Sequence, residues 1–348
     1  MNRDPAALPD FLFLEELHLR SMINFSDINA KEYTEKILQG DVVFLAKAIT
    51  LQESTQKENR KLGEQILENC MPYSGNSVRI GITGVPGVGK STFIEALGKV
   101  ILKEGKKIAV LTIDPSSKKN KGSILGDKTR MEELSKHKLV FIRPSPAGET
   151  LGGVANTTRE SIVLMEAAGY DVIIVETVGV GQSETSVHSM TDVFLLLLLA
   201  GAGDELQGMK RGIMEMADII CINKADGENI KKAKQAEADF KRAVHLFPPN
   251  ESGWNTVVET CSALENQNID TAWQHIQTYI NTTKTNGFFG DKRKQQSLEG
   301  FRQTLQNMLI QQVLQNKKLT KVVADAEKEI VENKILPSLA ARRVLDSI

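Results

Sequence analysis

A glycine-rich run between an apolar segment and a helical segment contains the residues best suited to chemistry. Residues 84–91 read Gly-Val-Pro-Gly-Val-Gly-Lys-Ser, which fits the pattern G-x-x-x-x-G-K-[ST]. Glycines allow successive backbone N–H groups to surround phosphate oxygens, and the following helix adds its positive N-terminal end. In this pattern Lys90 reaches the β- and γ-phosphates and serves catalysis, while the Ser91 hydroxyl ligates Mg²⁺. The residues expected to contact the phosphates are Gly84, Gly87, Val88, Gly89, Lys90, Ser91 and Thr92. The alternative is a glycine-rich turn with a chance Lys-Ser pair, but the apolar and helical flanks favour a nucleoside triphosphate site.

A second polar run follows an apolar segment further along the chain. Residues 219–222 are apolar, and Asn223, Lys224 and Asp226 come directly after them. Because a carboxylate only accepts hydrogen bonds, Asp226 matches guanine, which presents N1–H and a 2-amino group side by side. Lys224 is expected along the plane of the base, and Asn223 is expected to tie this run to the glycine-rich loop. Backbone groups after the next strand are expected near guanine O6, at Ser262, Ala263 and Leu264. The alternative is an ordinary strand-to-helix turn, but the two runs together predict GTP and GDP as the nucleotides.

Three carboxylates follow expected strands near the predicted metal position. They are Asp114, Asp127 and Glu176. Since Mg²⁺ keeps several waters, some of these acids would act through a water instead of ligating the ion directly. Asp114 also fits a helix cap or turn before Pro115, and the Gly-Asp pair at Asp127 is common in turns. The sequence therefore predicts three acidic residues at the Mg²⁺ site and leaves open which of them ligates the ion directly.

Two loops carry the residues that would couple the nucleotide to the rest of the chain. In residues 176–184, Gly179 can offer its N–H to the γ-phosphate. Many GTPases place a water-orienting glutamine directly after that glycine, whereas Val180 stands here. We therefore expect weak hydrolysis by the isolated protein, completed by a partner or another loop. Residues 201–210 form the second loop, which local sequence assigns equally to a switch or to a capped turn at Asp204.

Short apolar runs alternate with helical segments between these motifs, which predicts an α/β fold with a mostly parallel central sheet flanked by helices. Ligands bind beyond the carboxyl ends of the strands in such sheets, where the polar residues above fall. The expected strands cover 78–83, 108–113, 139–142, 172–176, 193–199, 219–222 and 256–261. Further helices are expected at 27–38 and 41–51, and an apolar stripe from Leu298 to Val313 indicates another, preceded by a polar linker or exposed loop at 282–296. The expected domains are an N-terminal helical extension (1–74), a P-loop domain (75–266) and a C-terminal helical arm (267–348).

Composition narrows the class of partner. The chain has 43 basic and 44 acidic residues, so its composition lacks the excess of positive charge that is typical of nucleic-acid-binding proteins. Three distant cysteines and five scattered histidines have no metal-ligand or disulfide spacing, which fits a reducing compartment. The most apolar run, 193–200, is too short to span a bilayer, and the N-terminus lacks a signal-peptide layout. We expect a cytoplasmic protein that binds neither nucleic acid nor a membrane.

The motifs taken together resemble those of a known family. The six stretches GVPGVGKST, DPSS, GDKTRM, ETVGVGQSE, GAGDELQG and NKAD resemble the MeaB/ArgK/MMAA group, within the SIMIBI class of P-loop GTPases. These are G-protein chaperones of adenosylcobalamin-dependent methylmalonyl-CoA mutase. The resemblance implies GTP hydrolysis that gates adenosylcobalamin loading and the removal of damaged cofactor. Some members have been labelled kinases of lysine/arginine/ornithine transport, a label that residues 223–226 do not support because they favour guanine and no phosphoacceptor site is evident.

The resemblance also assigns roles that local sequence leaves open. It implies a Mg²⁺ network at Asp114, Asp127 and Glu176, and a partner-responsive loop in which Gln207 and Lys210 couple hydrolysis to the mutase. It further implies a homodimer formed through the C-terminal arm. Two other classes remain: a metallocentre-maturation GTPase, which calls for a His/Cys cluster, and a nucleotide-dependent interaction module. Mutases of the isobutyryl or ethylmalonyl type remain alternative clients.

Overall fold

The structure, a computed structural model, describes residues 29–54, 56–113, 131–145, 151–177, 183–201, 211–248, 250–315 and 317–347. The chain divides into two compact units. The first comprises Met1–Gly75 with Val163–Gly169, and the second comprises Asn76–Ile162 with Tyr170–Ile348. No helix among the described residues is both long enough and apolar enough to cross a membrane.

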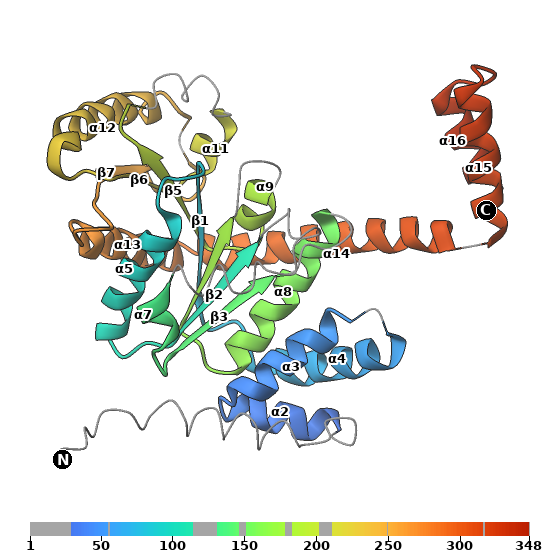
Figure 1. Ribbon diagram of the computed structural model, residues 1–348, viewed down its shortest axis with the longest axis horizontal. Coiled ribbons are helices and arrows are strands. Elements are labelled where there is room, and N and C mark those ends of the chain that lie inside the picture. The colour runs from blue at the N-terminus through green and yellow to red at the C-terminus, as the bar shows by residue number, and fades with distance from the viewer. Residues whose placement is uncertain are drawn as a thin grey trace, which may run out of the picture. The chain divides into compact units, whose positions relative to one another are not determined.

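A seven-stranded parallel sheet forms the centre of the second unit (Figure 1). Its strand order is β3-β2-β4-β1-β5-β6-β7. The strands are β1 (Val78–Gly84), β2 (Ile108–Ile113), β3 (Val140–Ser145), β4 (Val172–Thr177), β5 (Val193–Leu199), β6 (Ile219–Asn223) and β7 (Val257–Thr260). The predicted fold class and all seven predicted strands are confirmed.

Helices cover both faces of this sheet, which explains why most strand sequences are largely apolar. They are α5 (Lys90–Lys103), α7 (Glu132–Ser135), α8 (Leu151–Ala167), α9 (Ser183–His188), α11 (Arg211–Met216), α12 (Ile230–Val244) and α13 (Ile269–Thr285). Leu195 and Leu197 of β5 belong to the core that also contains α5 and α13. Leu196 and Leu198 belong to a second core with α11 and α12. Alternate residues of one leucine-rich strand therefore serve the two faces.

The parallel arrangement places the carboxyl ends of the strands at one edge of the sheet, which we call the carboxyl edge. The register pairs Ile82 of β1 with Glu176 of β4, and Leu199 of β5 with Asn223 of β6. The first residues of the strands lie at the opposite edge, which we call the amino edge. Glu176 and Asn223, two of the polar residues singled out in the sequence, thus share the carboxyl edge.

Three helices complete the second unit, and they correct one expectation. They are α14 (Phe288–Gln315), α15 (Lys317–Val331) and α16 (Pro337–Leu345). The linker expected at 282–296 is wrong, because α13 continues to Thr285 and α14 begins three residues later. The polar residues that suggested a linker bind the amino edge instead: Lys292 and Arg293 bond to Asp192, and Gln296 bonds to the carbonyl of Thr191.

The first unit is helical, as expected. Its elements are α2 (Ala30–Leu38), α3 (Val42–Gln52), α4 (Lys57–Cys70) and the 3₁₀ turn η2 (Met71–Tyr73). Asn29 caps α2 and Asp41 caps α3, each accepting backbone N–H bonds from the first turn. The rings of Tyr33 and Phe44 meet edge-on with centroids 5.2 Å apart, and both side chains are buried. These contacts join α2 to α3.

Candidate nucleotide-binding site

The glycine-rich loop connects β1 to α5, and its shape depends on two glycines. Gly84 passes so close to β5 that a Cβ there would lie 2.5 Å from the Leu197 carbonyl oxygen. Gly89 has φ of +93°, and a Cβ on it would lie 2.9 Å from Nδ2 of Asn223. Because Gly89 is the N-cap of α5, the N–H groups of the first turn are directed toward the loop. This arrangement forms an anion-binding concavity at the carboxyl edge.

Lys90 places a cation inside this concavity. Its Nζ donates to the carbonyl oxygen of Gly84 at 2.7 Å and to that of Val85 at 3.3 Å. The residue is only 9% exposed although it begins a helix. A buried ammonium that bonds to loop carbonyls is positioned to bond to phosphate oxygens instead, since charged acceptors form stronger hydrogen bonds.

Ser91 and Glu176 form the part of the predicted metal site that the structure describes. Ser91 Oγ lies 3.5 Å from Glu176 Oε1, and Glu176 is 4% exposed near the end of β4. Both offer hard oxygen donors, which is the chemistry that Mg²⁺ prefers. The residues that the structure describes contain no group of three or more His, Cys, Asp or Glu able to hold a metal ion. One hydroxyl and one carboxylate suit an ion whose remaining ligands are phosphate oxygens and water.

Asn223 links the end of β6 to the glycine-rich loop. Its Nδ2 donates to the Val88 carbonyl oxygen at 2.8 Å, across 135 residues of sequence. Its Oδ1 accepts from the N–H of Ala263 at 3.0 Å, so one buried amide joins three loops. Lys224 adds a bond from Nζ to the Gly87 carbonyl oxygen at 2.8 Å while its backbone holds φ at +59°. The expected tie between this run and the loop is present.

Asp226 and Ser262 approach each other at the same edge. Ser262 Oγ donates to Asp226 Oδ2, and it also accepts from the N–H of Glu265 at 3.2 Å. Ser262 is fully buried, whereas Leu264 is 77% exposed. The serine therefore fixes the orientation of a carboxylate that follows a different strand. Asp226 thus has a defined direction before any ligand arrives.

Several predicted residues lie outside the described residues. These are Asp114, Asp127, Gly179, Gln207 and Lys210. One contact at the site was missed from sequence: the hydroxyls of Thr83 and Thr177 lie 2.8 Å apart and are buried. A threonine near the end of each of two apolar strands is the signal that could have indicated this contact. The pair ties the end of β1 to the end of β4.

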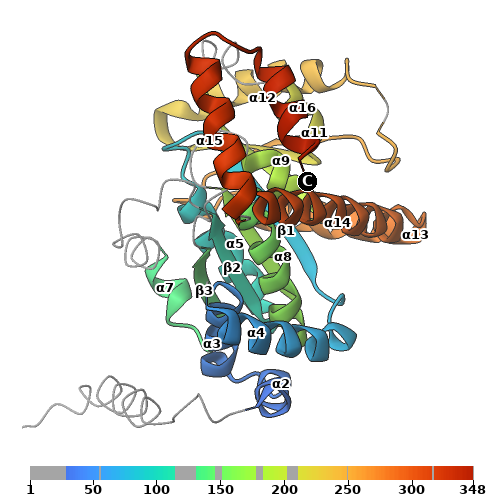
Figure 2. The same cartoon turned by 90° about the vertical axis from the view of Figure 1, so that its right-hand side faces the viewer.

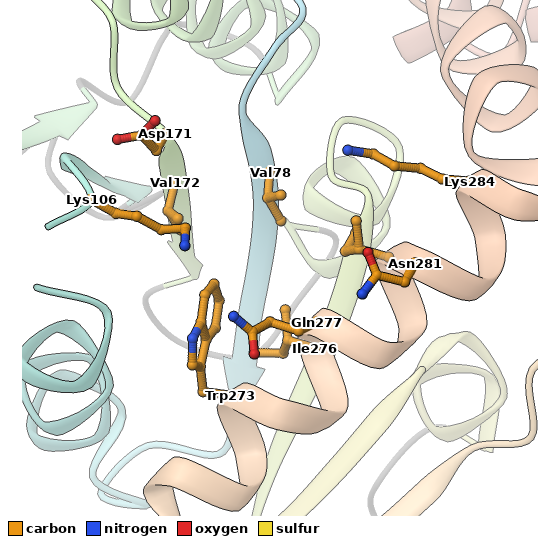
Figure 3. A pocket seen from close by; sticks show the side chains of 10 residues that line it. Val78, Lys106, Asp171, Val172, Trp273, Ile276, Gln277, Asn281 and Lys284 are labelled. Carbon is orange, nitrogen blue, oxygen red and sulfur yellow. The ribbon is translucent and has the colours of Figure 1, made fainter. Parts of the chain in front are cut away.

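A separate cavity of about 350 Å³ lies at the amino edge. Figure 3 shows Trp273, Ile276 and Gln277 reaching from α13 toward Val78 at the start of β1. The Trp273 indole donates to Glu104 at 2.6 Å, so its polar group is satisfied. None of the predicted site residues lines this cavity. The nucleotide site and the cavity thus belong to opposite edges of the sheet.

A parallel sheet with a phosphate-binding loop after β1 and an Asn-Lys-x-Asp turn after β6 defines a P-loop GTPase. The sequence model of the family described as "Methylmalonyl Co-A mutase-associated GTPase MeaB" matches residues 45–318. The chain belongs to this family, which confirms the resemblance seen in the motifs and the prediction of a GTPase.

Individual relatives agree with this assignment. A "Probable GTPase" of Mycobacterium tuberculosis is 46% identical over 307 residues, covering 88% of this chain and 91% of the relative. The mouse "Methylmalonic aciduria type A homolog, mitochondrial" is 38% identical over 319 residues, covering 89% and 77% respectively. A crystal structure described as a LAO/AO transport system kinase is 36% identical with a TM-score of 0.73, covering 91% of this chain and 96% of that one.

Proposed function

We propose that this GTPase is a chaperone that gates the loading of adenosylcobalamin onto a cobalamin-dependent acyl-CoA mutase, and that protects or reactivates the mutase. Methylmalonyl-CoA mutase is the proposed client. The family description and the name of the mouse relative support this client. The observation that carries the nucleotide part is the joining of three loops by Asn223, which places Asp226 and the glycine-rich loop in one site.

At the phosphate end, we assign the N–H groups of the loop and of the first turn of α5 to the phosphate oxygens. Lys90 would exchange its carbonyl partners for the β- and γ-phosphate oxygens. Ser91 and Glu176 would hold Mg²⁺, with Asp114 and Asp127 assigned to the same network. When bound, Mg²⁺ supplies charge neutralisation at the phosphates.

At the base end, Asp226 would accept hydrogen bonds from guanine N1–H and the 2-amino group. Ser262 supports this role by fixing the carboxylate from the side. Lys224 would cover the plane of the base with its aliphatic stem, and backbone groups of Ser262, Ala263 and Leu264 would reach O6. An adenine base would face the carboxylate with an acceptor and lose these bonds.

The coupling to the partner is assigned to residues outside the described ranges. Gly179 would contact the γ-phosphate, and Val180 stands where other GTPases place a water-orienting glutamine. Isolated hydrolysis is therefore weak, and the partner completes the site by acting on Gln207 and Lys210.

A homodimer is proposed through α14. Its stripe of apolar residues is exposed in the single chain, with Leu298 50%, Phe301 63% and Met308 62% exposed. A contiguous exposed stripe of this kind is typical of a protein interface.

The test is GTP turnover by the full chain with and without purified methylmalonyl-CoA mutase. We expect the mutase to accelerate turnover, and mutases of the isobutyryl and ethylmalonyl types serve as comparisons. A flat response to all of them removes the partner but leaves the GTPase. Lys90→Ala and Gln207→Ala extend the test to function: both variants should lose control over adenosylcobalamin loading, whereas intact control would mean that hydrolysis is incidental.

A further inference from the structure

The short helix α9 lies directly downstream of the nucleotide-binding edge. It begins at Ser183, and five residues separate it from Thr177 at the end of β4, the strand that carries Glu176. It packs on the backbone of β1: a Cβ on Gly81 would lie 2.9 Å from Val187 Cγ1. Gly81 is three residues before the glycine-rich loop begins. Helix α9 therefore contacts the strand that leads into the glycine-rich loop.

The downstream end of α9 is held by α14. The side-chain amide of Gln296 donates to the carbonyl oxygen of His188 at 3.2 Å and to that of Thr191 at 2.8 Å. The next residue, Asp192, accepts two bonds of 2.7 Å from Arg293. The turn from α9 to β5 is thus bound to the first turns of the same long helix that carries the exposed apolar stripe from Leu298 onward.

Arg159 of α8 completes this junction from a third element. The helices α8, α9 and α14 can be followed in Figure 2. Its Nη2 donates to Ser189 Oγ at 2.8 Å, and both terminal nitrogens lie 3.4 Å from Gln303 Oε1 of α14. Gly300 of α14 makes room for the guanidinium, because a Cβ there would lie 3.3 Å from Nε. The planar guanidinium of Arg159 therefore contacts two elements at the same time: Ser189, the residue that follows α9, and Gln303 of α14.

The junction is bonded incompletely. Among the described residues, the buried Nε of Arg159 and the buried Oε1 of Gln296 have no hydrogen-bond partner. The two bonds to Gln303 are also long for N–H···O bonds. Buried polar atoms of native proteins usually have a partner, so these two atoms mark a junction whose bonds are not all made. The junction is therefore held less firmly than the closely bonded pair of Arg293 and Asp192.

We infer that Arg159 is a positioning residue for GTP hydrolysis, which holds α9 against α14 and links the nucleotide state to the arm. The inference rests on the nucleotide position proposed above for Glu176, and it is independent of the mutase. Because α9 packs on β1 three residues before the glycine-rich loop, the strand that leads into the proposed nucleotide site contacts a helix whose far end this junction holds. By linkage, loosening the junction changes the preference between the two nucleotides.

The experiment compares Gln303→Ala, Ser189→Ala and Arg159→Lys in the full chain. Gln306→Ala is the matched control, because Gln306 is an exposed glutamine one turn further along α14. Two quantities are measured without any mutase: the single-turnover rate at saturating GTP, and the ratio of Kd for GDP to Kd for a non-hydrolysable GTP analogue. We expect the rate to fall about 5-fold and the ratio to shift by a similar factor, the lower range of measured couplings.

The melting temperature separates positioning from plain stability. If Arg159→Lys also lowers Tm, Gln303→Ala decides, since its side chain is partly exposed and its loss leaves no large cavity. The inference is overturned if all three variants match Gln306→Ala in both the single-turnover rate and the ratio of the two Kd values, whatever their Tm. Because the mutase is absent, failure of the partner proposal leaves this result unaffected.

Discussion

The two edges of the sheet both contain charged side chains removed from water, but they use them differently. At the amino edge, Asp192 is paired with Arg293 across 101 residues of sequence and also accepts from the backbone of Arg79. At the carboxyl edge, Lys90 bonds to carbonyl oxygens of its own loop. A charge paired with an opposite charge is costly to separate, whereas a carbonyl is readily replaced by a phosphate. The charged pair at the amino edge therefore stabilises the fold. At the carboxyl edge, Lys90 can exchange its carbonyl partners for phosphate oxygens.

Removing the cation of the carboxyl edge should give the largest functional effect. Lys90→Ala is expected to lower GTP hydrolysis by about 10³-fold, because it removes a charge from the position of the transferred phosphoryl group. Folding should change little, since the bonds from Lys90 Nζ to the Gly84 and Val85 carbonyls stay within the glycine-rich loop. Single-turnover hydrolysis and denaturant unfolding measured together check both statements. An equal loss in stability would break the contrast between the edges.

Asp192→Asn should have the opposite pair of effects: a large loss of folding stability and little change in nucleotide binding. It leaves the Arg293 guanidinium, whose side chain is 16% exposed, without its carboxylate. We expect the free energy of unfolding to fall by about 3 kcal/mol, the cost of breaking a largely buried pair. The Kd for GDP should stay within about 2-fold of the original value, because the pair lies at the amino edge. Urea unfolding and nucleotide titration test this, and weak binding with unchanged stability would contradict it.

Asp226→Asn sharpens the assignment of the base. An amide offers guanine a donor where its N1–H and amino group need acceptors, so GTP affinity should fall about 100-fold. Xanthosine triphosphate should recover part of the loss, since its 2-oxo group accepts from the amide. Competition titration with both nucleotides measures the change. Equal weakening for both nucleotides would mean that Asp226 supports the loop without contacting the base.

The smallest expected effect is the loss of folding stability at acidic pH that comes from His188. Burial, with the Lys292 charge beside it, lowers the pKa of His188 to about 4. The unfolded chain takes up this proton near its ordinary pKa of about 6.5 and the folded chain only near 4, so His188 removes stability as pH falls through that window. Between pH 7 and pH 5 the loss from this residue is about 1–2 kcal/mol.

His188→Gln isolates this contribution. Burial also raises the pKa of Asp218, which lies near Lys292, and that shift acts in the opposite direction on acidification. The comparison therefore uses the difference between the two proteins in unfolding free energy at pH 7 and pH 5. A pH dependence that is the same in both proteins would exclude His188 as its source.

Local patterns predicted the seven strands because most of them are largely buried and read as short apolar runs. The glycine-rich loop was predictable because its backbone geometry tolerates few residue types at Gly84 and Gly89. The helical structure of residues 282–296 was not predictable, because their polar side chains are typical of a linker. The partner of Arg293 in this segment, Asp192, lies 101 residues away in the sequence. Polarity alone does not distinguish a solvated loop from a helix whose polar face is paired.

The sequence by itself determined the sheet, the phosphate-binding loop and the choice of guanine, since each depends on residue type at short spacing. Only the tertiary structure decided that Asn223 bonds to Ala263 as well as to the loop, that Ser262 orients Asp226, and that Arg159 contacts both Ser189 and Gln303. These contacts connect residues from separate elements, and they exist because a parallel sheet brings distant strand ends to one edge. Side-chain partners of that kind are fixed by packing, which no short stretch of sequence encodes.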